Sequence, residues 1–179
     1  MKVTCSKRDA AARQLDVAIG LLFTDTDPLA IRTLVGAAYG ILVDIAEVQK
    51  KGSSWRTKLI EDSGLSEKDA LRTLNTAQNY LKHADKDPHE LLSFDEEEND
   101  HLIFMASIEC GIIGHSLSFS IQAFQIWYHA LYHEMFGHDT QHVRTAKEVF
   151  PDLSKKERRS QLILGKQFLE ASSEQKEMI

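Results

Sequence analysis

Two groups of side chains in this 179-residue chain have types and spacings that are compatible with chemistry. The first lies in the segment 78–88, Gln-Asn-Tyr-Leu-Lys-His-Ala-Asp-Lys-Asp-Pro, which combines a histidine with amide, cationic and carboxylate side chains. At a helix end, Asn79 and His83 would lie one turn apart on the same face and could address one ligand. His83 would then act as the base, Asn79 as the orienting group and Lys82 as the charge stabiliser near a phosphate. Asp85 completes this candidate catalytic group.

The same segment also has a purely structural interpretation. Lys82 and His83 would complement the negative C-terminal end of their helix. Asp85 can hydrogen-bond its own loop backbone, and Asp87-Pro88 is a common start for another helix. Both interpretations remain open at the level of the sequence.

The second group is a pair of histidines four residues apart, His129 and His133, with Glu134 beside the second. Two imidazoles at this spacing share a helix face and can share a cation, so these three residues are candidate metal ligands. The zinc-protease motif His-Glu-x-x-His is absent, because Gly137 stands where its second histidine would be. The alternative is that both histidines are half buried beside Trp127 and hydrogen-bonded. We expect no cofactor.

The elements that must position these residues are expected to be helices. Apolar residues recur every three or four positions along most of the chain, and no segment shows the sustained alternation of a strand. Ser6 predicts the start of a helix over 7–23, and Asp27 that of a central helix over 28–50, in which Gly36 and Gly40 allow a neighbour to approach. Further helices are expected over about 55–62, from 66 to about 83, from 95 to about 116, from 121 to about 136, and from 139 and 154 onward. The sequence therefore predicts an all-α, single-domain bundle of six to eight helices over 1–179, with 138–179 as a C-terminal helical extension.

The composition of the chain argues against several classes of protein. The hydrophobic fraction is 42% and the formal net charge is −6, so the chain can bury one core and is not basic like a dedicated nucleic-acid scaffold. Its two cysteines, Cys5 and Cys110, fit neither a disulfide framework nor a zinc knuckle. The N-terminus becomes charged before any apolar stretch, which is not the pattern of a secretory signal. A cytoplasmic location is therefore expected.

Three other segments have compositions that could indicate a function. The stretch 110–133 contains no Asp, Glu, Lys or Arg and is long enough to span a bilayer. Its serines, glutamines and histidines would be costly in hydrocarbon, so we expect a buried helix pair and no membrane partner. The basic run 155–159 is expected to be a solvated helix face. The aromatic residues around Trp127 are expected in the core or a dimer interface.

Two short blocks carry a family resemblance. The segment 79–88, with its Lys-His-Ala-Asp-x-Asp-Pro motif, and the segment 27–34, Asp-Pro-Leu-Ala-Ile-Arg-Thr-Leu, resemble a widespread bacterial family of uncharacterised helical proteins that is similar to HEPN-type domains. The resemblance implies a dimeric helical bundle and, in HEPN-like ribonucleases, a motif of an Arg, four to six intervening residues and then a His. Asn79 and His83 match the polar and histidine positions of that motif. Positions 76–78, where the Arg would stand, hold Thr, Ala and Gln, so metal-independent RNA cleavage would need another cation.

These observations predict a HEPN-like helical protein that acts as a binding or assembly module without catalysis. We expect a homodimer that buries part of the apolar surface of 110–136, and RNA or a nucleotide is a possible ligand. One alternative is an RNA-cleaving or nucleotide-handling enzyme that uses His83. The other is a metal-binding helical protein that uses His129 and His133.

Overall fold

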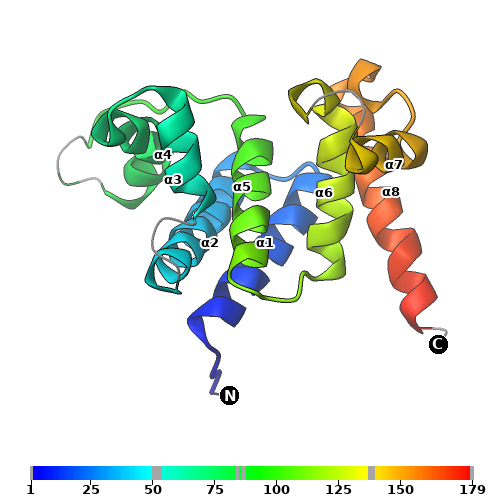
Figure 1. Ribbon diagram of the computed structural model, residues 1–179, viewed down its shortest axis with the longest axis horizontal. Helices are drawn as coiled ribbons and strands as arrows, with labels where there is room; N and C mark the ends of the chain where they lie inside the picture. Colours follow the sequence, from blue (N-terminus) through cyan, green and yellow to red (C-terminus); the bar gives the residue numbers. More distant parts are fainter. Residues whose placement is uncertain (1, 50–53, 84, 86–87, 137–139, 178–179) are drawn as a thin grey trace.

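The computed structural model describes residues 2–49, 54–83, 85, 88–136 and 140–177, and every regular element within these ranges is helical. The elements are α1 (Lys7–Phe23), α2 (Pro28–Gln49), α3 (Trp55–Ser63), α4 (Glu67–Lys82), α5 (Glu98–Ile112), α6 (Phe119–Leu131), the 3-10 turn η1 (His133–Phe136), α7 (Gln141–Val149), the 3-10 turn η2 (Leu153–Lys155) and α8 (Arg158–Glu177). The predicted all-α fold is confirmed (Figure 1).

The core forms where α1, α2, α5 and α6 pack together. α1 lies along α2, α5 packs on both of them, and α6 packs against α1 and α5 (Figure 1). The largest fully buried side chains include Leu15, Ile19, Leu42, Ile103, Phe124 and Trp127, which come from all four helices. α7 packs on α6, α8 packs on α6 and α1, and Ala146 of α7 and Leu162 of α8 belong to the same apolar cluster. The C-terminal helical segment therefore shares the core of the rest of the chain.

The central helix α2 is long and apolar enough to cross a membrane by length and composition alone. The core helix of a globular protein meets the same criterion, and α2 packs against α1, α4 and α5. The uncharged stretch 110–133 is not one helix, because α5 ends at Ile112 and α6 begins at Phe119. The prediction of two helices there is confirmed.

Side-chain caps explain most of the helix starts. Ser6 Oγ accepts a hydrogen bond from the backbone N–H of Asp9 at 3.1 Å, and Ser66 Oγ accepts one from that of Asp69 at 3.2 Å. Asp27 Oδ1 accepts the N–H of Leu29 at 2.7 Å, just before the proline that opens α2. The predicted starts at Ser6, Asp27 and Ser66 are confirmed.

Several helix boundaries differ from the prediction. α5 stops at Ile112, before the predicted end at about 116, because Gly114 adopts the left-handed conformation with φ of 70°. α6 ends at Leu131 and gives way to η1. In the C-terminal part, Ser154 lies within η2 and α8 begins only at Arg158. Asp139, the predicted start of the preceding helix, lies outside the described residues, and Thr140 caps α7.

Only one of the two glycines on α2 has a close neighbour. A Cβ atom at Gly36 would overlap the side-chain amide of Gln78, which lies on α4. A Cβ at Gly40 would meet nothing within 4 Å. The predicted close approach is therefore confirmed at Gly36, where it lets α4 dock on α2.

Candidate functional site

The predicted catalytic group lies at the C-terminal end of α4, on the surface. Asn79, Lys82, His83 and Asp85 are all exposed, and His83 is the C-cap whose backbone N–H donates to the Asn79 carbonyl at 3.0 Å. Asn79 and His83 therefore lie one turn apart, as the sequence predicts. Lys82 Nζ can donate to the side-chain oxygen of Gln78 at 3.0 Å. Its ammonium group therefore lies beside a residue of its own helix, one turn earlier. Residues 84, 86 and 87 of this segment lie outside the described residues.

The predicted metal ligands are distributed over a helix end and a turn. His129 is on α6, whereas His133 and Glu134 belong to η1, and His133 Nδ1 lies 3.2 Å from the carbonyl oxygen of Ala130. The ring of His129 stacks on that of His142 from α7, with centroids 6.0 Å apart. Within the described ranges, which leave out 137–139, no three His, Cys, Asp or Glu side chains form a group able to hold a metal ion.

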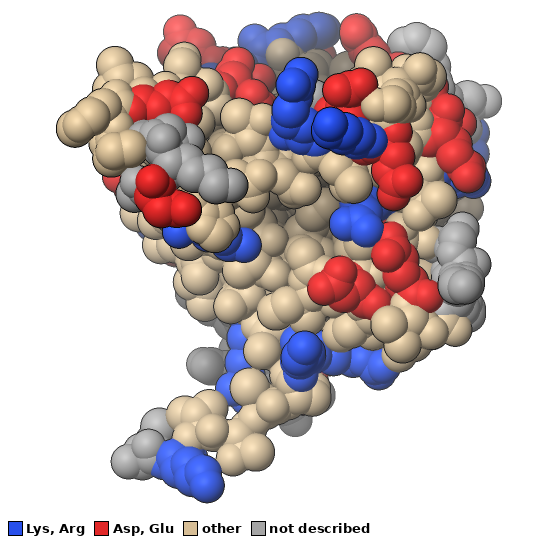
Figure 2. Space-filling view, turned by 90° about the vertical axis from the view of Figure 1, so that its left-hand side faces the viewer, with Lys and Arg blue, Asp and Glu red and all other residues tan. Residues whose placement is uncertain are grey.

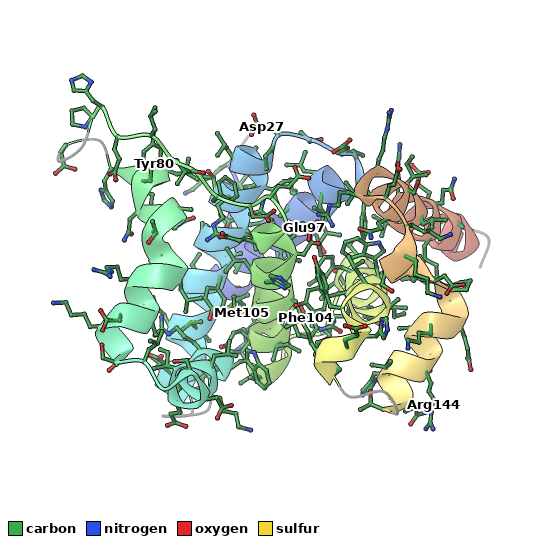
Figure 3. The ribbon with its side chains drawn as sticks, turned by 90° about the horizontal axis from the view of Figure 1, so that it is seen from above. Asp27, Tyr80, Glu97, Phe104, Met105 and Arg144 are labelled. Carbon is green, nitrogen blue, oxygen red and sulfur yellow. The ribbon has the colours of Figure 1, made fainter. Side chains whose placement is uncertain are left out.

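A cavity of about 460 Å³ lies between α2, α4, α5 and the segment that precedes α5. We call it the arginine cavity. Its polar lining includes Arg32, Arg72, Glu98 and His101, and its apolar lining includes Leu74, Phe94, Leu102 and Met105. Figure 3 shows Met105 on the side of α5 that faces α2 and α4. None of the four predicted catalytic residues is part of this lining.

Arg32 is the deepest charge of the arginine cavity. Its side chain is 5% exposed, and its Nε has no hydrogen-bond partner among the described residues. The nearest carboxylate belongs to Glu98, which is 50% exposed and whose Oε2 lies 3.7 Å from Arg32 Nη2. The guanidinium also lies 5.8 Å from the ring centroid of Phe94. Burial lowers the pKa of Arg32 from its ordinary value, and the charge of Glu98 opposes this only in part.

Gln78 holds the backbone of Arg32 in place. Its side-chain nitrogen can donate to the Arg32 carbonyl at 3.1 Å while its oxygen accepts from Lys82. The Gln78 side chain also occupies the space beside Gly36 that a Cβ atom would fill, which we call the notch. The position of Arg32 therefore depends on the docking of α4. Gln78, which stands where the HEPN-type motif would have a cation, therefore has a structural role here.

His101 connects the arginine cavity with a buried polar network. Its Nδ1 shares a hydrogen bond of 2.7 Å with Tyr128 Oη, and its ring lies 4.7 Å from that of Tyr132. Tyr132 Oη donates to Asp100 Oδ2 at 2.8 Å. Burial, followed by the charge of Asp100, raises the pKa of both tyrosines, so their phenols stay protonated and available as donors.

At the centre of that network a bidentate ion pair joins α5 to α8. Arg158 Nη1 and Nη2 donate to the two carboxylate oxygens of Asp100 at 2.7 and 2.8 Å, and Asp100 is 0% exposed. The guanidinium also lies 5.6 Å from the Trp127 ring centroid. The sequence-based expectation that the run 155–159 is a solvated face is therefore wrong for Arg158, because a buried carboxylate draws it inward.

Charges of both signs share the outer face of α3 and α4. Figure 2 shows Lys and Arg side chains interspersed with Asp and Glu around an uncharged area in the middle of this face. A protein that binds a nucleic-acid backbone usually gathers its cations into a stripe or patch. This face does not show the continuous basic patch that contact with a long polyanion usually requires.

No protein-family model, curated protein or solved structure matches this chain. The site must therefore be interpreted from its own geometry. The sequence does not identify Arg32, Glu98 or His101 as site residues, although Arg32 lies in the block 27–34. Arg72 is suggested by the sequence only as a cation that could replace the missing Arg of the HEPN-type motif. One signal was available for Arg32, because it is the only cation in the segment 28–49 and no other charged residue stands between 28 and 43.

Proposed function

We propose that the protein is a binding module whose arginine cavity holds a small anionic ligand with an apolar part. The observation that carries this proposal is the buried guanidinium of Arg32, which lines a cavity and whose one counter-charge among the described residues is the half-exposed carboxylate of Glu98, 3.7 Å away. A binding role agrees with the module without catalysis that the sequence predicts.

The burial of the Arg32 charge is energetically costly. A buried cation without a close partner is unfavourable, because protein atoms replace its water shell without restoring the hydrogen bonds. A carboxylate or phosphate group placed in the cavity would accept from Nε and a terminal nitrogen of Arg32 in the planar fork that guanidinium offers. Arg72, exposed at the same cavity, would add a second positive charge.

The remaining lining supports a ligand that is not purely ionic. Leu74, Leu102 and Met105 present hydrocarbon to the cavity. Small-molecule sites typically combine such apolar walls with a few polar groups that fix orientation. A compound such as a substituted acetate or an aryl phosphate has both parts.

Isothermal titration calorimetry with phenylacetate, octanoate and phenyl phosphate tests the proposal, with phenylacetamide as the uncharged analogue. We expect at least one anion to bind the wild type and phenylacetamide to bind about tenfold more weakly, since a charge-assisted hydrogen bond is lost. Arg32→Met should abolish this preference, whereas the exposed control Arg13→Met should retain it. Equal binding of anion and amide, or an unchanged preference in Arg32→Met, would contradict the proposal.

The stability of Arg32→Met separates a ligand-binding role from a structural one. If Arg32 serves binding, Met should leave the free energy of unfolding unchanged or raise it, because a poorly compensated buried charge is removed. If the contacts with Glu98 and Phe94 hold the fold together, the variant should lose stability. Chemical denaturation decides between these outcomes.

RNA cleavage with His83 as base is the second candidate function, favoured by the adjacent placement of Asn79 and His83 at the end of α4. Labelled RNA incubated with wild type and His83→Ala tests it. Loss of cleavage in the variant is expected under this function. Equal degradation by both proteins, or none, would eliminate it without affecting the proposal for the arginine cavity.

A further inference from the structure

A second cavity, of about 670 Å³, lies on the other side of α5, among α3, α5, α6, η1 and α7. We call it the histidine cavity. Trp55, Phe104, Ile108, Ile126 and Phe136 supply its apolar walls. Figure 3 shows Phe104 on the side of α5 that faces α6, opposite Met105 of the arginine cavity. The two cavities have no lining residue in common.

The described lining of the histidine cavity carries no formal charge. It contains no Asp, Glu, Lys or Arg, and its polar members are two histidines, three glutamines and a threonine. A ligand with a full charge would lose its hydration here without meeting an opposite charge. The lining therefore selects for a neutral ligand, in contrast with that of the arginine cavity.

His129 provides the polar anchor. Its ring packs against Phe104 and Phe136, with centroid distances of 5.4 and 4.5 Å, and its Nδ1 is buried with no hydrogen-bond partner among the described residues. Burial, followed by the neighbouring His142, lowers the pKa of His129 below its ordinary value of 6.5. The buried Nδ1 is a hydrogen-bonding atom that the described residues leave unused.

We propose that the histidine cavity binds a neutral aromatic molecule that bears one hydrogen-bonding group, of the phenol or indole class. The aromatic ring would lie against the walls formed by Phe104 and Phe136, which flank His129, and its O–H or N–H would be satisfied by His129 Nδ1. Aromatic side chains favour aromatic ligands through offset and edge contacts beyond simple burial. The histidine cavity shares no lining residue with the arginine cavity, so this proposal does not depend on the ligand proposed there.

NMR titration of labelled protein with phenol and indole tests the proposal, with benzoate and benzylamine as charged analogues of similar size. We expect saturable binding of phenol or indole that shifts the imidazole resonances of His129, and binding at least about tenfold weaker for both charged compounds. Absence of saturable binding by phenol and indole would overturn the proposal, as would equal affinity for the charged analogues.

Two variants locate the ligand. His129→Phe keeps a ring of similar shape but removes the nitrogen, and should weaken binding about tenfold, the cost of one hydrogen bond of ordinary strength. Ile126→Trp should fill the cavity and prevent binding, with Ile126→Phe in reserve if the larger residue unfolds the chain. The matched controls His115→Phe and Ile163→Trp replace residues outside the lining and should bind as wild type does. Unchanged affinity in His129→Phe would overturn the proposal.

Discussion

Asp100 is buried, whereas the other carboxylates of the acidic run to which it belongs are exposed. It belongs to the acidic run 95–100, which as a group matches the positive N-terminal end of α5. Asp100 alone is fully buried, and it accepts hydrogen bonds from Arg158 and Tyr132. Composition cannot reveal such a pair, because its members are separated by 58 residues and meet only when α8 packs on the bundle.

Breaking this ion pair should be costly. We expect Arg158→Met to lower the free energy of unfolding by about 3 kcal/mol, because Asp100 would remain buried without its partner. Arg159→Met removes the same charge from the exposed neighbouring position and should change stability by less than about 0.5 kcal/mol. Urea denaturation of both variants provides the comparison, and similar losses would show that the pair contributes little.

Glu109 should make stability depend on pH. It is 0% exposed, its Oε1 accepts the backbone N–H of Arg56 at 3.1 Å, and its Oε2 has no partner within the described part of the chain. Burial raises its pKa above the ordinary value of 4.5, so the folded state holds this proton more tightly than the unfolded state does. Stability from this group is therefore present below about pH 4.5 and is lost as the pH rises through the folded-state pKa.

Glu109→Gln tests that pH dependence, because the amide oxygen can still accept from Arg56 while it cannot ionise. We expect the difference in unfolding free energy between variant and wild type to grow in favour of Gln from pH 4 to pH 8. Denaturation at several pH values measures it. A constant difference over this range would mean that Glu109 ionises equally in both states.

At the level of the elements, local chemistry predicted where most helices begin. Ser6, Asp27 and Ser66 are N-caps whose hydrogen bonds involve residues two or three positions away, so the signal lies within one turn. Helix ends were less predictable. The periodicity of apolar residues continues past Ile112, and only the left-handed conformation of Gly114 terminates α5. α8 begins at Arg158, whose side chain pairs with Asp100, a residue 58 positions away that no local signal could indicate.

The two glycines of α2 make a matched test of how α4 docks. Gly40→Ala should raise the free energy of unfolding by up to about 1 kcal/mol, since alanine favours the helix and meets open space. Gly36→Ala should instead lower it, because the new methyl group would displace the Gln78 amide that bonds Arg32. Thermal denaturation of both variants measures the effect, and equal stabilisation by the two substitutions would show that α4 docks without needing the notch.

At the scale of the whole molecule, one continuous core explains why the single-domain prediction is confirmed, whereas the cavity that we propose as a binding site could not be predicted from the sequence. Core residues repeat once per turn and can be read from one helix at a time. The arginine cavity is made by α2, α4 and α5 together, and no single segment contains its pattern. The residues around His83 form a recognisable pattern because they are adjacent in the sequence. Arg32 and His101 are far apart in the sequence and line the same cavity only after folding.

Self-association is a second property of the whole molecule that the structure of one chain leaves as a prediction. Several large apolar side chains of 110–136 are buried within the chain, among them Phe124 and Trp127, but Ile126 and Leu131 are only half-buried and Met135 is 66% exposed. We expect a dimer in sedimentation-velocity measurements and a shift to monomer in Met135→Glu. A monomeric wild type would contradict the dimer expected from the sequence.

The proposed binding role of the arginine cavity requires that the buried Arg32 contact the anion directly. Its Nε–H proton can be followed directly by NMR in labelled protein during titration with the anions that calorimetry shows to bind. The proposal predicts that this resonance shifts saturably with the same affinity that calorimetry measures, and that phenylacetamide does not reproduce the shift. Saturable anion binding that leaves the Arg32 Nε–H resonance in place would contradict it.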